Sequence, residues 1–103
     1  MSLNADVLML RSGELWDSEV IDISATGVLI KRPVNWEGEL GEQLGLELLL
    51  GEFDTIGVFA TISRIDDDTI AFQYSRIPVR SEAPLWNLLG VHADTMEVPK
   101  AAS

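Results

Sequence analysis

The feature that most constrains the fold is an alternation of apolar with polar or small residues in two neighbouring segments. Leucine occupies every even position of residues 44–50, and the even positions of residues 56–62 are apolar as well. A period of two is typical of a half-buried β-strand. A helix is the competing interpretation of the first segment, since leucine and glutamate favour helices. The segment 55–65 is rich in β-branched residues, and we therefore predict two strands joined by a hairpin at 51–54.

Four other segments have the same strand character. They are short, rich in aliphatic, aromatic and β-branched residues, and bounded by turn-forming residues: residues 7–10, 15–21, 28–30 and 70–74. Consecutive strands joined by short turns form an antiparallel sheet, which must close or double over to bury its apolar side. We predict a mainly all-β fold, a six-stranded antiparallel barrel.

Two segments depart from the strand pattern. Pro33 lacks a backbone N–H and interrupts a strand, and residues 35–38 form a corner from which Trp36 is expected to fold over an open end of the sheet. Ser81 is a suitable N-cap for one short C-terminal helix, which Gly90 is expected to end. This helix should cover one mouth of the barrel or pack on its outer wall.

The chain length limits the organisation to one domain. A chain of 103 residues builds a single core, and we predict one domain over residues 1–103, with an ordered core at about 5–90 and a loose tail at 91–103. The absence of cysteine excludes disulfides, a cysteine nucleophile and thiolate zinc sites. Residues 1–4 lack the basic and apolar regions of a secretory signal, so we expect a cytoplasmic protein.

The charge balance bears on the partners. The net charge is -10, from 17 acidic and 7 basic residues. Nucleic acids and anionic lipids are held chiefly by cations that neutralise phosphates. We therefore expect neither nucleic-acid binding nor membrane insertion, and any anionic ligand must be held by cations gathered at one place.

The sequence does not indicate catalysis. His92 is the only histidine, and no serine or carboxylate stands around it at a spacing that indicates a triad. The acidic run 66–68 lacks the glycine and terminal glutamate of a calcium-binding loop, so we interpret it as a solvated hairpin tip. We expect no catalytic residues, no metal site, no cofactor and no enzymatic activity.

A turn of small and polar residues lies between two strands. Asp22 and Ser24 can each accept a hydrogen bond from a backbone amide nearby, and Gly27 is expected to supply a positive φ. Most such turns only connect strands, but exposed amides and acceptors also suit a ligand. Lys31 and Arg32 follow in sequence and favour an anion site.

The chain resembles the PilZ domain, a small bacterial β-barrel module associated with the second messenger cyclic di-GMP. Asp22, Ser24 and Gly27 match the family's D/N-x-S-x-x-G motif. The pieces around this motif also occur in the order and spacing of the family: the strand 28–30, the corner 35–38, the hairpin 44–65, the last strand 70–72 and the C-terminal helix 81–89.

The resemblance implies a nucleotide site with two parts. In the family, the D/N-x-S-x-x-G turn contacts guanine and phosphate edges, and an R-x-x-x-R motif ahead of the first strand clamps phosphates and stacks on guanine. Here Arg11 is the only cation before residue 31, and Val7 and Leu15 hold the positions four residues away from it. Either the natural chain carries the arginines ahead of residue 1, or this is a divergent member that binds the nucleotide weakly.

Two functions therefore remain open. One is a receptor module for cyclic di-GMP; the other is a ligand-independent adaptor that binds another protein through its barrel surface. The turn favours the first, and the missing arginines favour the second. The predicted ligand-binding residues are Asp22, Ser24, Gly27, Lys31, Arg32 and Arg11.

Overall fold

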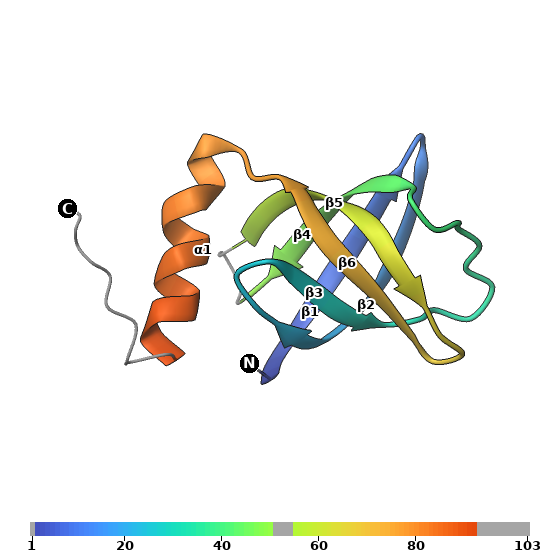
Figure 1. Ribbon diagram of the computed structural model, residues 1–103, viewed down its shortest axis with the longest axis horizontal. Helices are drawn as coiled ribbons and strands as arrows, with labels where there is room; N and C mark the ends of the chain where they lie inside the picture. The colour runs from blue at the N-terminus through green and yellow to red at the C-terminus, as the bar shows by residue number, and fades with distance from the viewer. Residues whose placement is uncertain (1, 51–54, 93–103) are drawn as a thin grey trace.

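The chain forms a six-stranded barrel with a helix at one end (Figure 1). The computed structural model describes residues 2–50 and 55–92. Its elements are β1 (Ser2–Arg11), β2 (Glu14–Ile23), β3 (Gly27–Lys31), β4 (Gln43–Leu49), β5 (Thr55–Ile65), β6 (Thr69–Arg76) and α1 (Val79–His92). The predicted fold class is confirmed, and β4 is a strand rather than the competing helix.

The barrel closes between two strands that are far apart in sequence. Neighbouring strands pair antiparallel in the order β1-β2-β3-β6-β5-β4, and β4 pairs with β1. In this closing pair Val7 lies opposite Leu48 and Met9 lies opposite Leu46. All four side chains are buried. The alternation of β4 therefore points its leucines into the barrel, as predicted.

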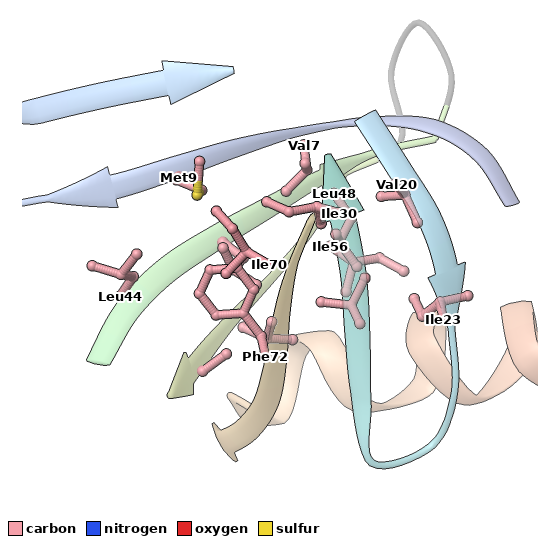
Figure 2. Close-up of a cluster of buried hydrophobic side chains, with 14 of the residues drawn as sticks. Val7, Met9, Val20, Ile23, Ile30, Leu44, Leu48, Ile56, Ile70 and Phe72 are labelled. Carbon is pink, nitrogen blue, oxygen red and sulfur yellow. The ribbon is translucent and has the colours of Figure 1, made fainter. Parts of the chain in front are cut away.

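The inward-facing side chains form one hydrophobic cluster. Figure 2 shows residues from all six strands pointing into the barrel, among them Val7, Val20, Ile30, Ile56 and Phe72. The remaining labelled side chains in that view are Met9, Ile23, Leu44, Leu48 and Ile70. Fully burying an aliphatic side chain contributes about 1.5–3 kcal/mol, so this cluster is the main stabilising element of the barrel.

Two different segments seal the ends of the barrel. Leu85 and Leu89 of α1 belong to the core cluster and cover one mouth, which we name the helix end (Figure 1). Trp36 is only 3% exposed and joins the same cluster from the connection between β3 and β4. That connection lies at the other end of the barrel, which we name the corner end (Figure 1). The predicted position of Trp36 over an open end is confirmed.

The first hairpin has the tight turn that its sequence predicts. Ser12 and Gly13 have φ values of 32° and 84°, and positive φ at both central residues is the pattern of a type I′ turn. In the β5–β6 hairpin, the Asp66 N–H donates to the Thr69 carbonyl at 2.9 Å. The predicted hairpin at 51–54 lies outside the described residues.

The helix begins earlier than predicted, and Ser81 is not its N-cap. Helix α1 starts at Val79, and the Ser81 N–H donates to the Pro78 carbonyl at 2.8 Å. The Ser81 hydroxyl donates instead to the Gly57 carbonyl of β5 at 2.6 Å. Ser81 is 3% exposed, so its hydroxyl bonds the helix to the barrel rather than capping the helix.

The helix also ends later than predicted. Gly90 lies inside α1, which includes residues 91 and 92, so the expected end at this glycine is wrong. Leu89 packs in the core one position earlier, and its burial offsets the modest helix penalty of glycine, about 1 kcal/mol relative to alanine. The rest of the predicted tail, residues 93–103, lies outside the described residues.

Replacing Ser81 with alanine should loosen the attachment of α1. The change removes a buried hydrogen bond to the Gly57 carbonyl, and we expect a loss of about 1–2 kcal/mol in the free energy of unfolding, measured by urea denaturation. Ser75→Ala is the control, because Ser75 is exposed. Equal stability of the two variants would contradict this role for Ser81.

Candidate functional site

The turn of residues 22–27 is held by bonds from Ser24. The Ser24 Oγ accepts from the amides of Thr26 at 3.2 Å and Gly27 at 3.3 Å, and the Ser24 N–H donates to the Gly27 carbonyl at 2.9 Å. The Asp22 Oδ1 accepts from the Ile23 amide at 3.0 Å. These are the local bonds that serine and aspartate make in turns. The predicted self-bonded turn is therefore present, with Asp22 and Ser24 both exposed.

Gly27 is needed for a different reason than predicted. The residues with positive φ in the described part of the chain are Ser12, Gly13, Asn35 and Gly41. Gly27 is not among them, so the expectation of a positive φ is wrong. A β-carbon at this position would overlap the Phe72 carbonyl oxygen of β6. Glycine therefore permits the close approach of β3 to β6, next to the turn.

Tyr74 ties the turn to β6. The Tyr74 hydroxyl donates to the Ser24 carbonyl at 3.2 Å, and the Tyr74 N–H donates to the Thr26 carbonyl at 2.9 Å. Burial raises the pKa of the Tyr74 phenol well above its ordinary value, which keeps the phenol protonated and able to donate. The turn is thus fixed both by its own side chains and by the neighbouring strand.

A groove of about 240 Å³ runs from the turn across the outer face of the barrel. In its middle, Asp22 of β2 lies opposite Leu29 of β3, Leu29 opposite Ala71 of β6, and Ala71 opposite Arg64 of β5. The remaining lining residues are Ile23, Ser24, Thr26, Gly27, Val28 and Phe72. The small side chain of Ala71 leaves the floor low between a carboxylate on one side and a guanidinium on the other.

Arg64 is the cation of this groove, and it is held in place from behind. Its Nε donates to the Asp66 Oδ2 at 2.9 Å, and the Thr69 hydroxyl donates to the same oxygen at 3.1 Å. This contact uses Nε alone, and within the described residues the two Nη groups of Arg64 have no hydrogen-bond partner. A guanidinium anchored through Nε keeps the paired donors that match a phosphate.

Lys31 and Arg32 lie away from the turn, although they follow it closely in sequence. A strand advances about 3.3 Å per residue, so β3 carries them on the order of 15 Å from Gly27, toward the corner end. The Lys31 Nζ pairs with Glu19 at 3.3 Å, and the Arg32 Nη1 donates to the Asp66 carbonyl at 3.0 Å. The structure does not bring these two cations to the groove.

Arg11 also lies at the corner end. Its guanidinium donates to Glu14 at 2.9 Å, to both carboxylate oxygens of Glu42, and to the Glu37 carbonyl at 2.9 Å. The hydrogen bond to Glu14 and then that to Glu42 raise the pKa of Arg11. Its centre lies 5.1 Å from the Trp16 ring. Arg11 therefore binds the β1–β2 hairpin to the corner and does not line the groove.

The described residues contain neither a cluster of metal-binding side chains nor a membrane-spanning helix. Asp66, Asp67 and Asp68 are exposed at the β5–β6 turn, as predicted for a solvated tip. Within residues 2–50 and 55–92, no group of three or more His, Cys, Asp or Glu residues is arranged to hold a metal ion. In the same part of the chain, every helix is too short or too polar to cross a bilayer.

The sequence matches the model of the PilZ domain family over residues 1–90. The chain belongs to the PilZ domain family. The match includes the 22–27 turn and all six strands, together with most of α1. No curated protein sequence is similar enough to this PilZ domain to count as a match.

Solved structures share the fold of this PilZ domain. The Bacillus subtilis inhibitor of motility, MotI (DgrA), is 21% identical, with a TM-score of 0.77 over 94% of this chain and 50% of that chain. This chain thus spans half the length of that protein. The PilZ domain of Escherichia coli YcgR, solved with c-di-GMP, is 13% identical, with a TM-score of 0.63 over 89% of each chain. An uncharacterised Legionella protein is 14% identical, with a TM-score of 0.54 over 85% of this chain and 86% of that one.

Arg64 is the groove residue that sequence reasoning missed. Apolar residues hold the even positions of β5 through Ile62, so strict alternation would place Arg64 inside the barrel. A shift of register between Ile62 and Arg64 turns the arginine outward instead. A charged residue at a position expected to face inward was the available signal, because β-bulges re-aim a side chain in this way.

Replacing Ser24 with alanine tests how far this residue holds the turn. The change removes the acceptor for the Thr26 and Gly27 amides, and we expect the free energy of unfolding to fall by about 0.5–2 kcal/mol. Thermal unfolding of the variant and the parent chain measures the loss. An unchanged melting temperature together with an altered ligand affinity would indicate that the hydroxyl serves a ligand rather than the turn.

Gly27→Ala tests the close approach of β3 and β6. The added methyl group must displace the Phe72 carbonyl, so we expect a destabilisation of about 1–3 kcal/mol by chemical denaturation. Gly90→Ala is the control, because a β-carbon there meets nothing within 4 Å. That helical substitution should be neutral or stabilising by about 1 kcal/mol. The same response from both variants would argue against the steric role of Gly27.

Proposed function

We propose that this PilZ domain is a cytoplasmic binding module for cyclic di-GMP, and that its groove beside the 22–27 turn binds the nucleotide weakly. One observation carries the proposal: the groove joins the side-chain oxygens of the turn to the guanidinium of Arg64 across four neighbouring strands. The turn alone offers little charge for a phosphate. Arg64 supplies it from β5.

The two sides of the groove suit different parts of the nucleotide. The Asp22 carboxylate can accept from the N–H groups on a guanine edge, since an ionised carboxylate is an acceptor only. The Arg64 Nη groups can donate to two oxygens of one phosphate, or the guanidinium can lie flat on a purine. Leu29 and Ala71 form the floor between them, and an apolar floor favours contact with the face of a base.

Weak binding follows from the charge and size of the groove. Cyclic di-GMP carries two phosphates, whereas Arg64 is the only cation among the groove residues described. Two missing arginines remove on the order of 3–6 kcal/mol at 1.5–3 kcal/mol for each charge-assisted bond, about a hundred- to ten-thousandfold in affinity. The groove of about 240 Å³ is also smaller than most small-molecule sites, so part of the ligand would stay in water. We expect a dissociation constant in the micromolar range or above.

Titration calorimetry with cyclic di-GMP tests the proposal through Arg64→Gln. This change removes the guanidinium, and we expect affinity to fall by about ten- to a hundredfold, the equivalent of one charge-assisted phosphate contact. Arg80→Gln is the matched control, since it makes the same charge change at an exposed position of α1 away from the groove. Its affinity should equal that of the parent chain.

Three results would count against the proposal. If titration with millimolar cyclic di-GMP gives no heat of binding, cyclic di-GMP is not the ligand. An equal loss in the Arg64 and Arg80 variants would indicate a general effect of charge. Submicromolar binding by the parent chain would refute the weakness that we derive from the single cation.

A second candidate function is a ligand-independent adaptor that binds another protein. It is favoured by a row of exposed apolar side chains on the other side of the barrel. Leu15 is 59% exposed, and Leu10 and Phe59 are each 39% exposed. Side chains of this size that lie side by side at the surface often mark a protein-binding site.

A further inference from the structure

The wall of the barrel centred on β1 and β4 faces away from the nucleotide groove. In the closed strand order, β1 and β4 lie opposite β3 and β6, which form the middle of the groove. We call this outer surface of the barrel the β1–β4 wall. Its outward positions form three rows across β2, β1, β4 and β5: Leu15-Leu10-Gly45-Phe59, Asp17-Leu8-Glu47-Gly57 and Glu19-Asp6-Leu49-Thr55.

The first row is apolar and has a notch in its middle. Leu15 and Leu10 are a cross-strand pair, and Phe59 lies on the far side of Gly45. A β-carbon at Gly45 would be 3.6 Å from the Leu10 Cβ and 3.9 Å from the Phe59 Cε1, which is ordinary van der Waals contact. The fold would thus accept a β-carbon there. The glycine leaves room between two exposed apolar side chains for an apolar side chain from outside.

The other two rows carry four carboxylates, and Lys31 and Arg32 line the same surface pocket as three of them, Asp6, Asp17 and Glu19. Asp17 and Glu47 lie on either side of Leu8, and Asp6 lies directly opposite Glu19. Like charges at directly opposed strand positions are destabilising. Lys31 pairs with Glu19 at 3.3 Å, with both side chains 61% exposed. Among the described residues, Asp6, Asp17 and Glu47 form no ion pair.

The charge of this wall restricts what can bind to it. A second copy of the chain placed face to face would bring two sets of carboxylates together, and nucleic acid or an anionic membrane would be repelled in the same way. A cationic partner is attracted by the carboxylates and can bury the apolar row at the same time. Such a partner must present apolar and basic side chains on adjoining faces.

We propose that the β1–β4 wall docks a basic amphipathic segment of another protein. Apolar side chains of the segment cover the row from Leu15 to Phe59 and fill the notch at Gly45. Its lysine and arginine side chains meet Asp17 and Glu47 in the adjoining row. The inference deepens the adaptor function and rests on it, but it is independent of nucleotide binding, because the groove lies on the other wall.

Fluorescence anisotropy with a labelled amphipathic helical peptide of leucine and lysine tests this surface on the full chain. A scrambled peptide of the same composition controls for charge alone, and we expect it to bind at least about tenfold more weakly. The double variant Asp17→Asn/Glu47→Gln should bind the amphipathic peptide about tenfold more weakly than the parent chain. Asp67→Asn/Asp68→Asn is the matched control, with the same charge change at the β5–β6 turn, and its affinity should be unchanged.

A second variant separates the apolar row from the charges. Leu10→Ser removes one side of the notch at an exposed position. It should also weaken binding of the amphipathic peptide. Circular dichroism checks that the variant keeps the fold. Equal loss in the two charge variants, or equal binding of both peptides, would overturn the proposal. Peptide binding that all wall variants leave unchanged would place the adaptor surface elsewhere. The same variants should bind cyclic di-GMP with the affinity of the parent chain. The peptide assay and the nucleotide titration therefore test the two proposals independently.

Discussion

The pairing of β4 with β1 is the constraint on which the rest of the structure depends. It joins strands that are separated in sequence by two other strands and the corner, and it converts an open sheet into a barrel. Only after this closure do the alternating side chains of every strand share one interior, which Trp36 and Leu85 then seal at its two ends. Such long-range pairing costs loop-closure entropy before stabilising contacts form. The segments that cover the two ends therefore help to keep the barrel closed.

The parts of the fold that could be predicted from the sequence are those with a local cause. The period of two gave β4 and β5 their inward faces, and Ser12 and Gly13 gave the first hairpin its turn. The start of α1 could not be obtained in this way, because Ser81 has the local signature of a cap. Its hydroxyl is instead drawn to the Gly57 carbonyl by packing against a strand that lies far away in sequence.

The same distinction between local and tertiary causes applies to the candidate site. The 22–27 turn was found because Asp22 and Ser24 bond to neighbours within a few residues. Nearness in sequence favoured Lys31 and Arg32 as its cations, but a straight strand carries both away from the turn, and neither lines the groove. Arg64 reaches the groove through a bulge, which its charge at an inward position signals, and through three strand pairings, which are tertiary features that no local pattern specifies.

Closure of the barrel also governs how this domain can associate with other chains. Each of the six strands is paired on both sides over at least part of its length, so the described sheet has no edge strand. An incoming chain therefore finds no full-length strand edge on which to add a strand, and such an edge is the usual start of edge-to-edge aggregation. Recognition on this barrel has to be made by side chains and turns. For that reason, exchanging a few surface residues can redirect the module to a new ligand or partner while the backbone stays as it is.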